Sequence, residues 1–386
     1  MEKEVKKVFT EVFDHPAQGT YFAPGRVNLI GEHTDYNGGY VFPVAITLGT
    51  YAAVSKREDH LVCLYSENFP EKGVIEFNLE DLTYKEIDDW ANYPKGMLYL
   101  LKERGFFIES GLEIAFYGNI PNSAGLSSSA SIELLMGVIL KDLFKLSITT
   151  LDLVKLGQKT ENQFIGVNSG VMDQFAVGMG QVDHALLLDT NTLDYEVVPA
   201  EFGAYVIAIM NTNKARKLAD SKYNERRKEC EQALQQLQKR LAIQSLGELE
   251  VKDLKANADL IEDEKLFKRA KHAVTENGRT KKAKITLEEG DLVEFGNLLN
   301  ASHASLQNDY EVTGKELDTL VIAAQHHPAV LGARMTGAGF GGCAIALVKE
   351  TSWQDFVKDV SQTYLDNIGY ASDIYQASID DGARKL

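Results

Sequence analysis

The sequence predicts a protein of two domains that combines β-strands with α-helices. Its 386 residues exceed what a single hydrophobic core normally organises, so two domains are the natural expectation. Residues 20–66 carry several β-prone runs, separated by glycine, proline and aspartate turn signals. Residues 132–143 place apolar side chains at alternating spacings of three and one, which is the pattern of an amphipathic helix.

The remaining elements are read from the same two patterns. In the first half of the chain we expect strands over residues 21–23, 41–46, 50–54, 61–65, 112–118 and 185–188. Helices are expected over residues 93–105 and 150–165. A strand is expected over 204–210. After residue 221 the chain becomes rich in Lys, Glu, Gln, Leu and Ala, with a helix expected over 224–241. We therefore place the domain change near residue 200, which gives domains 1–200 and 201–386.

Composition and charge narrow the class of protein. Hydrophobic residues make up 44% of the chain and charged residues 25%, which is ordinary for a globular protein. The net charge of −16 and the isoelectric point near 5.0 argue against a nucleic-acid or anionic-membrane partner, whose phosphates would repel the chain. An anionic ligand would therefore need a local device such as a helix N-terminus, a metal ion or a placed arginine.

Cysteine usage and the N-terminus indicate the compartment. Cys63, Cys230 and Cys343 lie far apart without a CxxC pair, which favours free thiols in a reducing cytoplasm. The charged N-terminus leads into no apolar segment, so a secretory signal is not expected. The longest apolar-leaning run, residues 40–54, is shorter than the roughly 20 residues that a membrane-spanning helix needs. We therefore expect a cytoplasmic protein with no membrane partner.

The densest group of polar residues lies at 25–36. It combines a cation, two carboxylates, an imidazole, an amide and two glycines, at Arg26, Glu32, Asp35, His33, Asn28, Gly25 and Gly31. A core strand would not carry so many polar groups, because each buried one needs a partner. The stretch favours a cleft that binds a hydroxyl-rich ligand, although a polar turn between strands would have a similar composition.

A second group is the loop at 121–131, which contains one glycine and five serines and leads directly into the expected helix. Small residues let backbone N–H groups approach a ligand, and the helix N-terminus directs its positive dipole end to the same place. The loop therefore predicts a triphosphate site, with a serine-rich helix cap as the alternative. It is not a Walker A loop, because Gly314-Lys315 is followed by Glu316, and the sequence lacks the His-Arg-Asp and Asp-Phe-Gly triplets of protein kinases.

Three weaker signals complete the set. Glu161 and Asp173 flank a glycine-containing turn, and carboxylates of this kind can hold magnesium beside phosphates. By spacing alone, ordinary surface acids are the more common explanation. The glycine cluster at 337–342 can form a second backbone surface against phosphates or a plain turn before a strand. Tyr223 can bind a ligand or serve in packing.

The order of the motifs at 24–36, 121–131 and 335–342 resembles the GHMP small-molecule kinases. The first motif goes further, because residues 25–36, together with residues 161–174, resemble the signature of the galactokinase family. The resemblance extends from about residue 8 to the end of the chain. It implies an α+β, two-domain GHMP-kinase fold of mixed sheets and helices, with the active site in the cleft between the domains.

The resemblance also implies a role for each matching residue. Arg26 stabilises the transferred phosphoryl group, and Asp173 is the acidic partner of the anomeric hydroxyl. The sugar is held by Glu32, His33, Thr34, Asp35, Gly170, Asp173 and Tyr223. ATP is contacted by Ser66 and by the loop residues Ser123, Ala124, Gly125, Leu126, Ser127, Ser128 and Ser129. Magnesium is held by Ser129 and Glu161.

The activity that the resemblance implies is transfer of the γ-phosphate of ATP to the anomeric hydroxyl of galactose, with Mg2+ as cofactor. This is the first step of galactose catabolism, and a monomer is implied. The kinase alternative is a related sugar as substrate: N-acetylgalactosamine, galacturonate or arabinose. The alternative of another class is a sensor that binds galactose and ATP without turnover. The complete serine loop and the presence of Asp173 favour catalysis.

Overall fold

The computed structural model describes residues 1–121, 125–167, 169–214 and 219–386. A six-stranded sheet is the framework of its first lobe. Its strands, in order across the sheet, are β13 (Arg384–Lys385), β1 (Gly19–Asn28), β3 (Pro43–Lys56), β6 (Leu112–Gly118), β4 (Leu61–Ser66) and β5 (Ile75–Asn78). Neighbours pair antiparallel except β4 and β6, which are parallel. The last strand thus returns the C-terminus to the sheet that contains β1.

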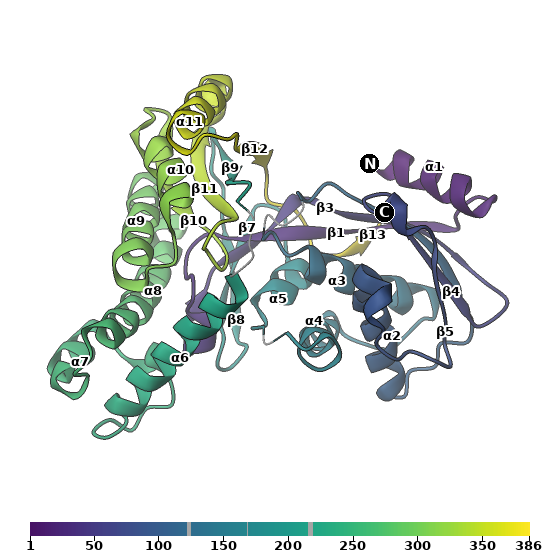
Figure 1. The fold of residues 1–386 in the computed structure, drawn as a ribbon, viewed down its shortest axis with the longest axis horizontal. Coiled ribbons are helices and arrows are strands. Elements are labelled where there is room, and N and C mark those ends of the chain that lie inside the picture. Colours follow the sequence, from purple (N-terminus) through teal and green to yellow (C-terminus); the bar gives the residue numbers. More distant parts are fainter. Residues whose placement is uncertain (122–124, 168, 215–218) are drawn as a thin grey trace.

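Helices cover both faces of this sheet (Figure 1). On one face lie α2 (Asn92–Glu103), α3 (Ser128–Leu143), α4 (Thr150–Lys159) and α5 (Met172–Met179). On the other face lies α1 (Glu2–Phe13), whose Phe9 packs with Ala53 and Ala115. Because side chains alternate across a strand, Ala52 and Val54 turn instead toward the large core beneath α3. The sheet is therefore buried on both sides, which makes β1 a rigid support for the residues that follow it.

The second lobe is built on a four-stranded antiparallel sheet with helices outside it (Figure 1). Its strands, in order, are β10 (Val330–Met335), β11 (Cys343–Lys349), β9 (Tyr205–Asn211) and β12 (Asp373–Ala377). Its helices are α6 (Ala219–Leu237), α7 (Val251–Ala256), α8 (Glu264–Glu288), α9 (Leu292–Ser305), α10 (Lys315–His326) and α11 (Trp353–Ile368).

An apolar core joins the two lobes. Ala208 and Met210 of β9 face the helices of the second lobe, whereas Ile207 and Ile209 face the opposite way. These isoleucines share a cluster with Val27 and Val44 from the long hairpin of β1 and β3. A small third sheet of β2 (Tyr40–Val41), β7 (His184–Asp189) and β8 (Tyr195–Pro199) lies beside this junction. The shared core fixes the lobes around the loops that emerge between them.

Most of the predicted elements are observed, with three differences. Residues 25–28 belong to the end of β1, because a register shift after Pro24 lets the strand continue and its polar side chains find partners. The helix predicted over 150–165 ends at Lys159 and continues as the π-helical turn Thr160–Ile165. The helix predicted over 224–241 is α6, which ends at Leu237.

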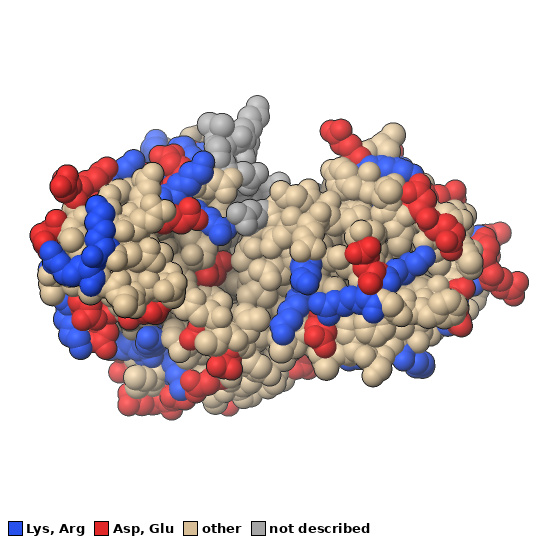
Figure 2. All heavy atoms as spheres, turned by 90° about the horizontal axis from the view of Figure 1, so that it is seen from below, with Lys and Arg blue, Asp and Glu red and all other residues tan. Residues whose placement is uncertain are grey.

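Two expectations about organisation can be placed in this fold. The predicted change of domain near residue 200 falls between β8, which ends at Pro199, and β9, which begins at Tyr205. On the face drawn in Figure 2, basic and acidic side chains are interspersed over both lobes. Within the described chain, we find no helix of the length and apolarity needed to cross a membrane.

Candidate active site

A cavity of about 690 Å³ opens between the lobes, and both lobes contribute to its wall. The first lobe supplies residues from the end of β1, the start of α3 and the start of α5. The second lobe supplies Tyr223 and Asn224 of α6, together with Gly337 and Ala338 of the glycine cluster. The motifs that the sequence analysis singled out in three distant parts of the chain therefore meet at one cavity.

The centre of the cavity is an ion pair between Arg26 and Asp173. Arg26 Nε and Nη2 donate to the two carboxylate oxygens of Asp173 at 2.9 and 2.8 Å. Ser127 Oγ donates to Asp173 Oδ2 at 2.5 Å, so three hydrogen bonds hold this carboxylate. Arg26 is 5% exposed, and a bidentate ion pair of this kind fixes the positions of both the guanidinium and the carboxylate.

Two residues of the serine loop, Gly125 and Leu126, are held against the same arginine. Arg26 Nη1 donates to the Gly125 carbonyl at 2.8 Å, and its backbone N–H donates to the Leu126 carbonyl at 3.2 Å. A Cβ at Gly25 would lie 2.7 Å from the Leu126 carbonyl, so only glycine permits this close approach. The glycine of the polar motif thus positions the serine loop beside Arg26.

Beyond this contact, helix α3 begins with its N-terminus at the cavity. Ser127 is its N-cap and has a left-handed backbone with φ of 62°, a conformation that serine seldom adopts. Ser128 and Ser129 follow in the first turn and line the cavity with Glu161, which is 7% exposed. The N-terminal N–H groups of α3 are suited to bind anionic oxygens. Ser123 and Ala124 lie outside the described residues.

On the opposite side, Glu32 is anchored by a residue of the second lobe. Arg334 Nη2 donates to Glu32 Oε2 at 2.7 Å, and Asn28 Nδ2 donates to Oε1 at 3.4 Å. Both Glu32 and Arg334 are almost fully buried. Burial raises the pKa of Glu32, and the charge of Arg334 opposes that effect. The pair leaves a carboxylate in fixed orientation at the cavity wall.

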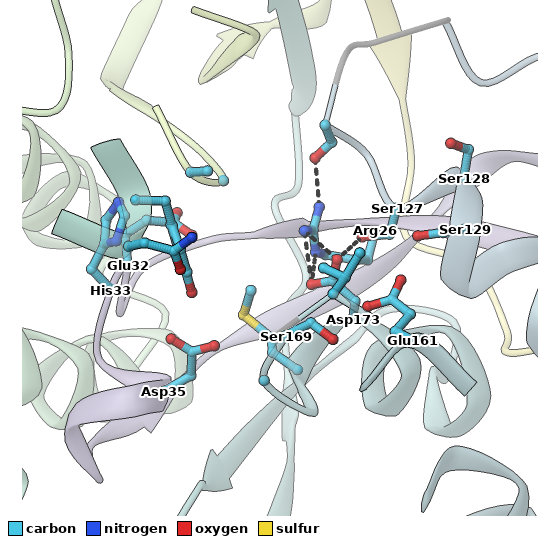
Figure 3. Close-up of a pocket in the computed structure, with 18 of the residues that line it drawn as sticks. Arg26, Glu32, His33, Asp35, Ser127, Ser128, Ser129, Glu161, Ser169 and Asp173 are labelled. Carbon is cyan, nitrogen blue, oxygen red and sulfur yellow. Dashed lines mark hydrogen bonds and ion pairs between the residues drawn. The ribbon is translucent and has the colours of Figure 1, made fainter. Parts of the chain in front are cut away.

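His33 and Asp35 complete this side of the cavity (Figure 3). Burial lowers the pKa of His33 to about 3, so the imidazole is neutral at physiological pH. Burial raises the pKa of Asp35 to about 6, and the charges of Asp173 and Glu32 add to this rise. Gly170 lies against Asp35, because a Cβ there would come within 2.3 Å of Asp35 Oδ2. A neutral imidazole and a carboxyl group therefore face the same space.

The remaining predicted residues differ in where they lie. Tyr223 lines the cavity, with its ring 5.5 Å from that of His33. Of the predicted residues that the structure describes, Leu126, Thr34 and Ser66 do not line it. Thr34 is buried and donates to the carbonyls of Gly31 and Tyr40, which braces the loop from behind. Ser66 is buried at the end of β4.

Sequence reasoning missed the residues that support the polar loop from the second lobe. Arg334 precedes the glycine cluster, but no local pattern distinguishes it from a surface arginine. In α8, Glu276 Oε1 accepts from the backbone N–H groups of Gly31 and Glu32 at 3.1 and 3.4 Å. Burial opposes ionisation of Glu276, but the charges of Arg279, His272 and Arg334 lower its pKa to about 2. Polar residues at helical spacing, such as Glu276, are not part of any motif, so the sequence did not predict that they support the polar loop.

The cavity also has a donor set that suits magnesium. Ser129 and Glu161 offer a hydroxyl and a carboxylate on the side of the cavity where α3 begins. Among the described residues there is no cluster of three or more His, Cys, Asp and Glu side chains that could hold a metal by itself. Magnesium keeps several waters and commonly takes one or two carboxylates plus substrate phosphates. Two protein oxygens beside an anion site fit that pattern.

The fold and the cavity together define a GHMP-type small-molecule kinase. Residues 92–181 match the description "GHMP kinases N terminal domain", and residues 283–364 match "GHMP kinases C terminal". The structure of a mevalonate kinase superimposes with a TM-score of 0.67 over 94% of this chain and 99% of the other, at 18% identity, which supports the fold alone. The predicted α+β GHMP-kinase fold is thereby confirmed.

Within that class, the chain belongs to the galactokinase family. Residues 7–56 match the "Galactokinase galactose-binding signature". The chain is 64% identical to a galactokinase of Enterococcus faecalis and 58% identical to one of Ligilactobacillus salivarius, each over 100% of both chains. The structure of Lactococcus lactis galactokinase complexed with galactose matches with a TM-score of 0.95 and 57% identity, over 100% of this chain and 99% of that one. The family consists of ATP-dependent sugar kinases.

Proposed function

We propose that this chain transfers the γ-phosphoryl group of ATP to the anomeric hydroxyl of α-D-galactose, giving galactose 1-phosphate and ADP. The observation that carries the proposal is the position of the Arg26–Asp173 pair. Glu32, His33 and Asp35 lie to one side of this pair, and Ser128, Ser129 and Glu161 lie to the other (Figure 3). A sugar on the first side and a triphosphate on the second would meet at these two residues, as in-line transfer requires.

Asp173 is the group we assign to the acceptor hydroxyl. Three donated hydrogen bonds, two from Arg26 and one from Ser127, hold its two oxygens in place. Such a carboxylate accepts a hydrogen bond from the anomeric hydroxyl and orients its oxygen toward the phosphorus. It takes the proton only as the new O–P bond forms, because the hydroxyl becomes acidic late in the reaction. Orientation is therefore its main contribution.

Charge on the transferred group is balanced by residues on the other side. Arg26 lies beside the reacting groups, and the N-terminus of α3 directs its N–H groups toward the phosphates. Ser129 and Glu161 would hold Mg2+, which when bound supplies positive charge to the phosphate oxygens. Since the cavity lies between two lobes, closure around both substrates would exclude water that competes with the sugar hydroxyl.

Recognition of the sugar rests on acceptors with fixed positions. The carboxylate of Glu32 is oriented by Arg334, and that of Asp35 lies against Gly170. A sugar whose hydroxyl does not reach such a buried acceptor leaves it unpaired, which costs up to about 10⁴-fold in rate. This is the physical basis on which galactose would be distinguished from its epimers.

The setting we propose for this reaction is the cytoplasm, with the enzyme as a monomer. None of Cys63, Cys230 and Cys343 forms a disulfide, and all three are buried, as expected in a reducing compartment. The residues that line the cavity come from both lobes of the chain, and a monomer is what the family resemblance implies. Sedimentation of the purified protein would test the monomer, since a stable dimer would double the mass.

The proposed reaction is tested by ADP release with ATP and Mg2+ over a panel of sugars: galactose, N-acetylgalactosamine, glucose, arabinose and galacturonate. We expect turnover with galactose and slower turnover with its close 2-substituted analogues. Preference for another sugar of the panel would contradict the substrate but keep the class of kinase. Galactose binding by calorimetry without turnover of any sugar would instead make the protein a sensor.

A further inference from the structure

One bulky residue interrupts the glycine cluster at 337–342. The backbone has a positive φ at the four glycines of the cluster and also at Phe340, where φ is 58°. Glycine adopts such a backbone freely, whereas a large side chain is strained in it. A glycine at residue 340 would suit the local backbone better, so the contacts of the Phe340 ring must offset the strain.

The backbone of the cluster is seated on neighbouring segments of the second lobe. The Phe340 N–H donates to the Val312 carbonyl at 2.7 Å, and a Cβ at Gly339 would lie 2.3 Å from the same carbonyl. At the end of the cluster, the Thr212 N–H donates to the Gly342 carbonyl at 2.9 Å. These contacts hold the main chain but leave the direction of the Phe340 ring to its side-chain neighbours.

The ring of Phe340 lies against two cations of α6. Lys222 Nζ lies 5.3 Å from the ring centroid, and the guanidinium carbon of Arg226 lies 5.9 Å from it. Cations at such distances are attracted by the face of an aromatic ring. The two residues are one helical turn apart, so both reach the ring from the same face of α6. The ring is also partly buried against the apolar core of the second lobe.

Arg226 is a fixed support for this ring, because its guanidinium is bonded on its other sides. Nε donates to the Tyr310 carbonyl at 2.7 Å, and Nη2 donates to the Glu311 carbonyl at 3.1 Å. Nη1 donates to the carboxylate of Glu229 at 3.1 Å and lies 3.6 Å from that of Glu225. The side chain that contacts the ring therefore cannot move freely with it, and it holds the ring in place.

Between its two cations, α6 carries residues of the cavity wall. Tyr223 and Asn224 line the cavity from α6, and Gly337 and Ala338 line it from the glycine cluster. The ring of Tyr223 lies 5.5 Å from that of His33, which places this part of α6 on the sugar side. The contact between Phe340 and α6 therefore joins the two parts of the wall that the second lobe supplies.

We propose that Phe340 is a positioning residue, whose ring latches the glycine cluster onto α6 and so holds Tyr223 at the sugar side of the cavity. Phe340 does not line the cavity itself, so it acts through the wall residues that it joins. The part of this inference that concerns galactose rests on the proposed function, whereas the latch between the cluster and α6 does not.

The latch is tested first in the protein without ligands, by hydrogen exchange of backbone amides measured by mass spectrometry. Phe340→Gly removes the ring and suits the left-handed backbone, so the variant keeps the path of the chain. We expect the amides of residues 222–230 to exchange at least about tenfold faster than in wild type. Unchanged exchange would overturn the latch. The readout needs no turnover, so it judges the latch whichever sugar is the substrate.

The positioning role is tested by steady-state kinetics. In Phe340→Gly we expect KM for galactose to rise about tenfold with kcat within about threefold, because the sugar-side wall loosens while Arg26 and Asp173 keep their contacts. Phe340→Tyr keeps an aromatic face for the two cations and should hold KM within about twofold of wild type. Phe340→Leu keeps the apolar bulk without the aromatic face and should raise KM about threefold.

Two results would overturn parts of this assignment. A Phe340→Gly variant with the KM of wild type would overturn the positioning role. A Phe340→Leu variant with the KM of wild type would overturn the contribution of Lys222 and Arg226. Failure of the proposed function is distinct from both, because wild type itself would then not turn over galactose.

Leu193→Gly is the matched control. Leu193 is also a large apolar residue with a left-handed backbone, with φ of 64°, but it lies between β7 and β8 and does not line the cavity. Its replacement should leave both the exchange of α6 and KM for galactose unchanged. An equal rise of KM in Leu193→Gly and Phe340→Gly would overturn the latch, since the effect would then not depend on contact with α6.

Discussion

At the scale of single residues, three carboxylates at one cavity have three different surroundings. Asp173 is held by Arg26 and Ser127, and Glu32 is held by Arg334. Asp35 is the one with a pKa raised to about 6, because burial and its acidic neighbours disfavour its charge. The polar motif at 25–36 singled out Arg26, Glu32 and Asp35, whereas Asp173 was expected at the site only from the family resemblance. The sequence could not predict their partners Ser127 and Arg334, since these depend on which side chain turns toward which.

Asp35 should make galactose binding depend on pH. Only the ionised carboxylate accepts from two sugar hydroxyls, and with a pKa of about 6 it becomes protonated as the pH falls through 6. We expect the dissociation constant of galactose to be steady above pH 7 and to rise about tenfold for each pH unit below 6. Calorimetry without ATP measures it. His33 does not contribute, because its pKa of about 3 lies below this range.

The matched variant is Asp35→Asn, which keeps the shape of the side chain and cannot ionise. Its affinity for galactose should be low and the same from pH 5 to 7.5. An unchanged pH dependence in Asp35→Asn would assign the titration to Glu32, whose pKa is also raised by burial. A wild-type affinity that is flat over this range would show that ionised Asp35 is not needed.

Ser127 should matter for rate more than for binding. Its hydroxyl donates to Asp173 Oδ2, and its strained left-handed backbone is what directs it there. Ser127→Ala removes one of three donors to this carboxylate, so we expect kcat to fall about tenfold with little change in KM for galactose. Ser147→Ala is a suitable comparison, because Ser147 is exposed and does not line the cavity. Steady-state kinetics on both variants measures kcat and KM. A kcat of Ser127→Ala equal to that of wild type would contradict a role of the Ser127 hydroxyl in holding Asp173.

At the scale of elements, the sequence predicted those with a strong local pattern. The β-prone region 20–66 and the striped helix 132–143 are observed as β1–β4 and α3. Helix α8 is the contrasting case, because its His272, Glu276 and Asn277 resemble the polar face of a solvated helix. They are buried instead, and they bond the loop at Glu32, Gly31 and Tyr40. Only the packing of α8 against the polar loop reveals that role.

The close approach of two loops at Gly170 gives a prediction at this scale. A Cβ at residue 170 would lie 2.3 Å from Asp35 Oδ2, so one of the two loops must move. We expect Gly170→Ala to raise KM for galactose by at least about tenfold. Gly278→Ala in α8 is the control, since a Cβ there meets nothing within 4 Å and alanine favours a helix. Equal KM values for the two variants would argue against contact of the sugar with this pair of loops.

At the scale of the whole molecule, Arg334 of β10 ties the second lobe to the polar loop of the first. Besides its pair with Glu32, it donates to the carbonyls of Asn28 and Leu29 at 2.8 and 3.2 Å. These partners are separated by about 300 residues, so periodicity and motif spacing carry no information about them. The cleft between the lobes could be expected from family resemblance, but not the buried ion pair that shapes it.

Loss of this tie should lower global stability. Arg334→Gln leaves Glu32 buried without its charged partner, so we expect the free energy of unfolding to fall by about 3–5 kcal/mol in urea titrations. Adding Glu32→Gln should recover part of the loss, because the unpaired charge is then gone. Arg240→Gln breaks the exposed pair with Asp259 and should change little. A small effect of Arg334→Gln would mean that the junction does not depend on this pair.

The central claim is that sugar and phosphate meet at Asp173, and Asp173→Asn tests it most directly. The measurement is kcat for ADP release with galactose, beside the galactose dissociation constant from calorimetry, with the exposed Asp194→Asn as control. The claim predicts a fall in kcat of at least about 10²-fold, with galactose affinity kept within about tenfold of wild type. A variant that retains turnover within tenfold of wild type would contradict the claim.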